Sequence, residues 1–329
     1  MKIGYLGAGA WGFCLANLLA EKGYEVTLWT ENPSLLKRRK EHPKFQNHRA
    51  EENLVLTMDL NEAIENAHLI IESVTSGGLR SVLDQVKQLK EILAPLVLTS
   101  KGIERGTGFL MPDIALDVLG TSFRDKVGCL SGPSLADEVM NKLPTSVVAS
   151  AYNPELTKQI CKVFSTPFFR VYPSEDIQGT SLGGAMKNII AIACAISDGL
   201  GYGQNTKAAL MTQGLQEMKK LAKKMGYDPD TLIGLSGLGD LCATCLSTHS
   251  RNYIFGQLLA QGDLPEKAQE KIGMIVEGSY TCASALELSA KVGIEMPITE
   301  TVYSIIYEKI TPKEAIENLL SRSVKRELL

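Results

Sequence analysis

Short apolar runs alternate with amphipathic segments through the first half of the chain. Each run has the length of a β-strand, and between several of them apolar residues recur at helical spacing. The apolar runs predict strands at residues 2–6, 24–29, 54–58, 69–74, 96–100, 127–130, 146–150 and 168–172. One helical pattern ends at Gly23, and others span residues 60–67, 79–93 and 154–164. Such alternation is typical of a mostly parallel sheet covered by helices on both faces.

The strand pattern stops near residue 174, and the patterns that follow are helical. After the segment around Lys187 they span residues 208–225, 251–260, 279–292, 299–309 and 312–320. Thr311 is the predicted N-cap of the last helix, with Pro312 in the first helical position. We therefore predict an α/β sheet domain over residues 1–173 and an all-helical domain over residues 174–329. Nothing near residue 174 indicates a flexible linker, so the two domains are expected to be docked tightly.

One predicted helix, within residues 181–205, is apolar or small on nearly every face. Between Asp176 and Asp198 its only charged residue is Lys187. The pattern predicts a buried helix, whose uninterrupted apolar run, residues 189–196, is too short to cross a bilayer. Because burial makes the pKa of an amine tunable, Lys187 is a candidate for proton transfer or anion binding. A lysine that reaches solvent from the helix end is the alternative interpretation.

A glycine motif, GAGAWG, directly follows the first predicted strand and opens a helix. Gly7 permits a tight turn, Gly9 lets the backbone approach a pyrophosphate, and Gly12 lets the helix pack on the strand. The phosphates would then lie at the positive end of the helix. The motif predicts a dinucleotide site, the alternative being a tight turn without a ligand.

The residue that follows the second strand bears on which dinucleotide binds. Glu31 stands about 20 residues after the glycines, where this kind of fold contacts the adenosine ribose. Its carboxylate would accept a hydrogen bond from a ribose 2′-hydroxyl and repel a 2′-phosphate. A basic run at residues 37–40 could reach such a phosphate, but we interpret it as a solvated helix face. We therefore expect NAD or NADP, with NAD favoured.

Composition narrows the class of protein. The 329 residues carry a net charge of −3, which provides no electrostatic reason to expect nucleic acid or an anionic membrane as partner. Seven scattered cysteines do not resemble a disulfide framework. Cys242 and Cys245 form a lone CxxC pair without clustered histidines, so no metal is expected. With no signal peptide and no integral membrane segment evident, we expect a cytoplasmic protein.

Polar residues gather in residues 234–252, which are rich in glycine and include Asp240. We interpret this stretch as a loop that holds a small polar ligand. Arg251 and Asn252, at the start of a helix, are suited to binding a phosphate, although a surface loop with an arginine ion pair is the alternative. Lys101 lies just past one predicted strand, and Ser134 lies past another as a predicted N-cap.

Seven motifs together resemble the NAD(P)-dependent glycerol-3-phosphate dehydrogenase family. In chain order they are GAGAWG, TSKGIE, LSGPSLADE, GGAMKNIIAIACAISDGLGYGQN, GLGDLCATCLSTHSRN, VEGSYT and EMPITETVYSI. The resemblance covers nearly the whole chain. It implies a Rossmann-like domain followed by a helical domain, reversible reduction of dihydroxyacetone phosphate to sn-glycerol 3-phosphate feeding glycerophospholipid synthesis, and commonly a homodimer.

The resemblance also implies roles for residues in the matching motifs. Lys187 matches the catalytic lysine of the family and Asp240 its acidic companion. Substrate-binding positions match Lys101, Gly132, Ser134, Asn188, Ser250, Arg251 and Asn252. Positions near the dinucleotide match Ala10, Trp11, Lys101, Ala136, Arg251, Ile275 and Glu277, in addition to the three glycines and Glu31.

Three departures from the family pattern stand out. Glu31 replaces an arginine that bacterial relatives often carry, which argues against a preference for NADP. The turn Val74-Thr75-Ser76 replaces the usual Val-Pro-Ser, so its shape is in question. A tyrosine-leucine-proline loop is replaced by FQNHRAEEN at residues 45–53. A β-hydroxyacid dehydrogenase and a non-catalytic dinucleotide sensor are the competing interpretations. The first does not explain the motif around Asp240, and the second needs neither Lys187 nor Asp240.

Overall fold

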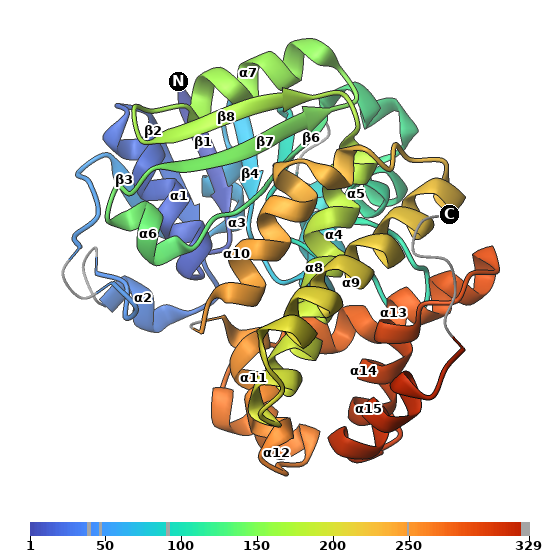
Figure 1. Ribbon diagram of the computed structural model, residues 1–329. Helices are drawn as coiled ribbons and strands as arrows, with labels where there is room; N and C mark the ends of the chain where they lie inside the picture. Colours follow the sequence, from blue (N-terminus) through green and yellow to red (C-terminus); the bar gives the residue numbers. More distant parts are fainter. Residues whose placement is uncertain (38–40, 46–47, 90–92, 249, 324–329) are drawn as a thin grey trace.

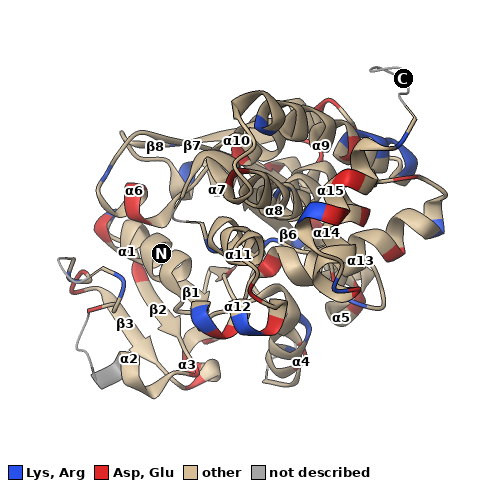
Figure 2. Cartoon of the chain, turned by 60° about the horizontal axis from the view of Figure 1, so that its bottom comes forward, with Lys and Arg blue, Asp and Glu red and all other residues tan. Residues whose placement is uncertain are grey.

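The computed structural model describes residues 1–37, 41–45, 48–89, 93–248 and 250–323. For residues 36 and 37 it describes the backbone only. A sheet carrying helices on both faces forms one part, and a body of helices from the second half of the chain forms the other (Figure 1). In the view of Figure 2, basic and acidic residues are interspersed over the helices that face the reader.

All eight predicted strands are present, and they form a single sheet in the order β3-β2-β1-β4-β5-β6-β7-β8. Neighbouring strands are parallel except for the antiparallel pair β6–β7. The mostly parallel sheet is thus confirmed. The strands are β1 (Lys2–Leu6), β2 (Glu25–Trp29), β3 (Leu54–Thr57), β4 (Leu69–Glu72), β5 (Leu96–Leu98), β6 (Val127–Ser131), β7 (Thr145–Ala151) and β8 (Phe169–Ser174).

Helices cover both faces of this sheet because successive strand residues point to opposite sides. On β1, Ile3 and Tyr5 join one apolar core with α1 and α7, whereas Leu6 joins a second core with α3, α4 and α5. The sequence patterns did not indicate α5. The helices are α1 (Ala10–Glu21), α2 (Pro33–Lys37), α3 (Leu60–Ile64), α4 (Leu79–Leu89), α5 (Met111–Leu119), α6 (Ala136–Met140) and α7 (Pro154–Phe164).

The second half of the chain is helical, as predicted, and Thr311 caps the last helix by accepting a hydrogen bond from the Glu314 N–H. Among these helices, α12 was not predicted. The helices are α8 (Ile177–Gly199), α9 (Gln204–Met225), α10 (Asp240–Leu246), α11 (Arg251–Ala260), α12 (Pro265–Ile272), α13 (Glu277–Val292), α14 (Pro297–Tyr307) and α15 (Pro312–Leu320).

Helix α8 runs through the middle of this body, packed against α9, α10, α11, α13 and α14 (Figure 1). By length and composition alone its 23 residues could cross a membrane, which the shorter apolar run had not suggested. Its most apolar window, however, is 100% buried inside the protein. The prediction of a buried core helix is confirmed.

Two local predictions were wrong. Ser134 does not cap α6, which begins two residues later with Leu135 in the N-cap position. The Ser134 hydroxyl instead donates to the Gly132 carbonyl at 2.9 Å. Most of residues 234–252 is not a loop, because a π-helical turn, Leu235–Gly239, leads directly into α10. The glycines serve close packing there, since a Cβ on Gly237 would lie 2.1 Å from the Leu232 carbonyl oxygen.

Candidate active site

The predicted site residues of the sheet domain follow the carboxyl ends of neighbouring parallel strands. Gly7 follows β1, the turn at residues 73–76 follows β4, Lys101 follows β5, and Gly132 follows β6. Parallel strands bring these ends to one edge of the sheet, which is where ligands of such folds collect. Helix α8 packs against β6, so Lys187 reaches the same edge.

One buried carboxylate connects two lysines at this edge. Lys187 Nζ donates to Asp240 Oδ1, and Lys101 Nζ donates to Asp240 Oδ2 at 2.6 Å. Lys101 also donates to the Gly132 carbonyl at 3.2 Å. Asp240 is only 1% exposed, whereas the side chain of Lys101 keeps 18% of its surface in solvent. The structure therefore brings together three residues that are far apart in the sequence, with Lys187 buried and Lys101 partly exposed.

Thr244 completes the surroundings of Lys187. It lies one helical turn after Asp240 on α10, and its hydroxyl donates to the Asp240 carbonyl at 2.7 Å. With its proton used in this way, Thr244 Oγ1 accepts a hydrogen bond from Lys187 Nζ at 2.9 Å. No role for Thr244 was predicted from the sequence. Thr244 follows Asp240 by four residues, a spacing that places both side chains on one face of a helix. That spacing could have indicated that Thr244 lies beside Asp240.

Two glycines of α8 allow this approach. A Cβ on Gly184 would lie 2.8 Å from Ser131 Oγ and 3.2 Å from the aliphatic stem of Lys101. A Cβ on Gly183 would lie 2.5 Å from the Ser236 carbonyl oxygen in the turn before α10. The helix backbone can therefore contact both the strand end that carries Lys101 and the turn that leads to Asp240.

Burial dominates the protonation of Lys187. Loss of hydration lowers the pKa of its ammonium group from 10.5 to about 8, with nearby Lys101 acting in the same direction. Asp240 opposes both by raising the pKa, but it does not cancel them. From the sequence alone the balance was open. In the structure it places the pKa in a range where the amine can both donate and accept a proton near neutral pH.

The predicted substrate-binding amides join three helices beside this site. Asn252 Nδ2 on α11 donates to Asn188 Oδ1 on α8 at 2.9 Å. The Gly278 N–H on α13 donates to Asn252 Oδ1 at 3.0 Å. Both amides are buried, so they hold α11 and α13 in fixed positions against the helix of Lys187.

Arg251 is exposed at the start of α11, where Ser250 is the N-cap residue without a side-chain capping bond. Arg251 NH1 donates to the Ile275 carbonyl at 2.7 Å, which brings together two residues expected near the dinucleotide. The hydrogen bonds described for Arg251 and Ser134 join them to Ile275 and Gly132 rather than to the Lys187–Asp240 pair.

The glycine motif forms a cradle that fits a dinucleotide. Gly7 has φ +103°, and a Cβ there would lie 2.8 Å from the Ser73 backbone after β4. A Cβ on Gly12 would lie 1.9 Å from the Gly7 carbonyl oxygen, whereas one on Gly9 would meet nothing within 4 Å. Gly9 is the N-cap of α1 and is thus the glycine that leaves open space at the helix N-terminus.

The other predicted dinucleotide residues surround this cradle. Ala10 and Trp11 open α1, and Cys14 on the same helix donates to the Ala136 carbonyl at 3.5 Å, which places Ala136 beside α1. Glu31 is exposed just after β2, whose end is tied to the motif by the Gly7 N–H donating to the Trp29 carbonyl at 3.1 Å. The basic run at residues 37–40 lies outside the residues whose side chains are described.

Glu277 of the helical part contacts the turn after β4. Its carboxylate accepts hydrogen bonds from the Ser76 hydroxyl and, at 3.2 Å, from the Ser76 N–H. In this turn Thr75 has φ −68° and ψ 150°, values that proline also adopts. Replacing the usual proline by Thr75 is therefore compatible with the same turn shape.

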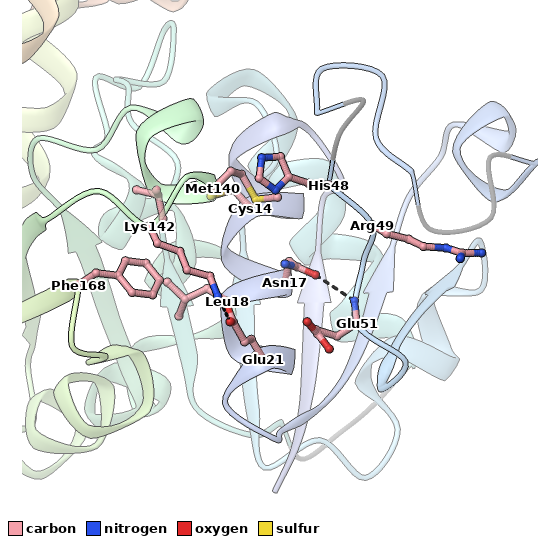
Figure 3. A pocket seen from close by; sticks show the side chains of 11 residues that line it. Cys14, Asn17, Leu18, Glu21, His48, Arg49, Glu51, Met140, Lys142 and Phe168 are labelled. Atoms are coloured by element: carbon pink, nitrogen blue, oxygen red, sulfur yellow. Dashed lines mark hydrogen bonds and ion pairs between the residues drawn. The ribbon is translucent and has the colours of Figure 1, made fainter.

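A separate hollow of about 160 Å³ lies between α1, α6 and residues 48–51. In Figure 3 the Lys142–Glu21 ion pair and the hydrogen bond from the Glu51 N–H to Asn17 lie across it. No residue that we predicted for the catalytic, substrate or dinucleotide site lines this hollow.

Comparisons with known proteins identify the family. The family description "NAD-dependent glycerol-3-phosphate dehydrogenase N-terminus" matches residues 2–157, and its C-terminus counterpart matches residues 176–317. The chain belongs to this family. The resemblance stated from the motifs is thus confirmed, and the β-hydroxyacid dehydrogenase interpretation was wrong.

Relatives match the dehydrogenase over nearly its whole length. A glycerol-3-phosphate dehydrogenase [NAD(P)+] of Protochlamydia amoebophila is 53% identical, over 100% of this chain and 99% of its own. That of Chlamydia pneumoniae is 54% identical, over 99% of each chain. The crystal structure of the glycerol-3-phosphate dehydrogenase from Coxiella burnetii is 37% identical, with a TM-score of 0.92 over 98% of this chain and 99% of that one.

Proposed function

We propose that this dehydrogenase reversibly reduces dihydroxyacetone phosphate to sn-glycerol 3-phosphate, with Lys187 as the proton donor. The observation that carries the proposal is the buried Lys187–Asp240–Lys101 cluster, which lies at the same sheet edge as the glycine cradle. Membership of the NAD(P)-dependent glycerol-3-phosphate dehydrogenase family supports the reaction, and it supports NAD or NADP as the cofactor.

The cofactor, NADH or NADPH, supplies a hydride when bound. Gly7, Gly9 and Gly12 would hold its phosphates, and Glu31 its adenosine ribose; Ala10, Trp11, Ala136, Ile275 and Glu277 would line the rest of its site. Hydride addition to the ketone carbon builds negative charge on the ketone oxygen, which a nearby acid must neutralise.

The ammonium group of Lys187 donates that proton, and the neutral amine accepts it back when glycerol 3-phosphate is oxidised. Asp240 holds Lys187 and Lys101 in place, so Lys101 contributes a fixed positive charge beside the developing oxyanion. Thr244 fixes the direction of the Lys187 ammonium group. Gly132, Ser134, Asn188, Ser250, Arg251 and Asn252 complete the proposed substrate site.

The substrate phosphate provides a test of the substrate class. Arg251→Lys keeps the positive charge but loses the two-pronged guanidinium, so the KM for dihydroxyacetone phosphate should rise about 10-fold. The measurement is NADH oxidation with dihydroxyacetone phosphate beside unphosphorylated dihydroxyacetone, which offers nothing for the guanidinium to bind. If KM rises equally for both substrates, the role of Arg251 is structural: it holds the segment of Ile275, to whose carbonyl it donates a hydrogen bond.

Cofactor choice provides a second test. Because Glu31 stands at the ribose end of the cradle, wild-type kcat/KM should be higher with NADH than with NADPH. Glu31→Arg should move the ratio toward NADPH, since the change replaces a repelling charge with an attracting one. Glu25→Arg, at the far end of the same strand, is the matched control and should leave the ratio unchanged. A wild-type preference for NADPH would contradict the role given to Glu31.

We further propose a homodimer in the cytoplasm, acting on a small phosphorylated substrate and feeding glycerophospholipid synthesis. The proposed domains are residues 1–173, which bind the dinucleotide, and residues 174–329, which carry Lys187. The last strand ends at Ser174 and α8 begins at Ile177, which supports this division.

A further inference from the structure

We propose that Glu72 is a positioning residue that fixes both Lys101 and the turn after β4. Glu72 is the last residue of β4, paired with Leu6 of β1 and Leu98 of β5 in the middle of the sheet. It is 0% exposed, and it belongs to none of the motifs through which the chain resembles its family. The proposal rests on the function proposed above, because it concerns the placement of residues assigned to that reaction.

The Glu72 carboxylate links two segments of the site. Its Oε1 accepts a hydrogen bond from the Val74 N–H at 2.5 Å, and its Oε2 accepts one from the Ser100 hydroxyl at 2.7 Å. Val74 begins the turn that Glu277 holds at Ser76, and Ser100 immediately precedes Lys101. One carboxylate therefore sets the distance between the dinucleotide-facing turn and the strand end that carries a lysine of the reactive cluster.

The backbone of Glu72 is itself held by a chain of hydroxyl groups. The Thr99 hydroxyl donates to the Glu72 carbonyl at 2.8 Å and lies 2.5 Å from Ser73 Oγ, which lies 2.7 Å from the Tyr5 hydroxyl. These bonds tie β1, β4 and β5 together directly below the turn. The carboxylate thus projects from a fixed base, as a residue that positions others must.

The stability of the folded sheet does not explain why a carboxylate, rather than an apolar side chain, occupies position 72. Burial raises the pKa of Glu72 to about 7, while the bonds from Ser100 and Val74 lower it. Both partners are neutral groups, and the paired residues Leu6 and Leu98 are apolar, so a hydrocarbon side chain would suit the strand better than a buried acid. A buried carboxyl group with hydrogen bonds on both sides is instead suited to holding two segments in register.

Glu217 on α9 is the matched control. Its carboxylate is likewise buried, with a pKa raised to about 7 by burial, and it accepts bonds from the Ile298 N–H at 2.5 Å and the Thr299 N–H at 3.2 Å. It thereby caps the N-terminus of α14, and neither Ile298 nor Thr299 is a residue that we assigned to the dinucleotide or substrate site. Glu217 and Glu72 share chemistry and burial, and they differ in whether their partners belong to the site.

The test compares Glu72→Gln, Ser100→Ala and Glu217→Gln in the purified full-length protein. Glu72→Gln should lower kcat and raise the KM for the dinucleotide, each about 10-fold, because an amide cannot accept both bonds in the present geometry. Ser100→Ala removes only the hydrogen bond between Glu72 and the segment that carries Lys101, so it should lower kcat and leave the dinucleotide KM unchanged. Glu217→Gln should lower the thermal midpoint and leave kcat and both KM values unchanged.

The inference is overturned if Glu72→Gln and Ser100→Ala lower only the thermal midpoint and keep wild-type kinetics. If Glu72→Gln does not fold, Ser100→Ala decides, and an unchanged kcat rejects the proposal. Wild-type activity in the same assay separates this result from a failure of the proposed function. A wild-type protein that does not reduce dihydroxyacetone phosphate contradicts the function itself, whatever the variants do.

Discussion

Replacing Lys187 with alanine is expected to lower the kcat of dihydroxyacetone phosphate reduction by about 100-fold or more, because the reaction loses its general acid. Dinucleotide binding should remain nearly intact, since the glycine cradle lies at the end of β1 rather than on α8. The measurement is steady-state turnover together with titration of NADH binding.

Lys187→Arg is the matched variant for this experiment. A guanidinium keeps the positive charge beside Asp240, but its pKa is too high for it to exchange a proton near neutral pH. Arginine should therefore restore little of the lost turnover. Near-normal turnover in the folded alanine variant would remove Lys187 from the mechanism.

Asp240→Asn is expected to have the second-largest effect, because one carboxylate serves two ammonium groups. Losing it leaves the buried Lys187 without its opposite charge, which destabilises a protein by roughly 3–5 kcal/mol in comparable buried pairs. Asp240 is also the influence that raises the pKa of Lys187. Without Asp240 that pKa should fall further, so reduction should be lost at a lower pH than in the wild type.

Asp198→Asn is the control for the loss of a buried ion pair. Asp198 accepts a hydrogen bond from the buried Lys207 at 2.7 Å, at the far end of α8. That variant should lose stability without moving the pH at which reduction is lost. If Asp240→Asn also leaves this pH in place, Asp240 does not tune Lys187.

Elements governed by local sequence could be predicted. The eight strands follow from short apolar runs between helical patterns, and the glycine cradle follows from a turn in which Gly7 and Gly12 leave no room for a Cβ. The cap at Thr311 depends on residues within three positions. The burial of α8 follows from its apolar faces, because no orientation of that helix exposes a polar side.

Features that depend on tertiary contacts could not be predicted. Lys187 and Asp240 meet across 53 positions of sequence, and the pKa of Lys187 depends on a balance of burial and charge that exists only after they meet. The glycine-rich sequence around Gly237 is typical of a loop, and the close packing of Gly237 against the Leu232 backbone is visible only in the structure. Glu72 lies inside the predicted strand at residues 69–74, and its hydrogen bond from Ser100 forms only when β4 and β5 are paired.

The pH dependence of wild-type kcat/KM for dihydroxyacetone phosphate tests the central claim most directly. Reduction needs the ammonium form of Lys187, whose pKa burial lowers to about 8. We predict that kcat/KM is constant below this pH and falls about tenfold per pH unit above it, while oxidation of glycerol 3-phosphate rises through the same range. A reduction profile that stays flat until about pH 10.4, where an ordinary lysine titrates, would contradict a buried Lys187 as the proton donor.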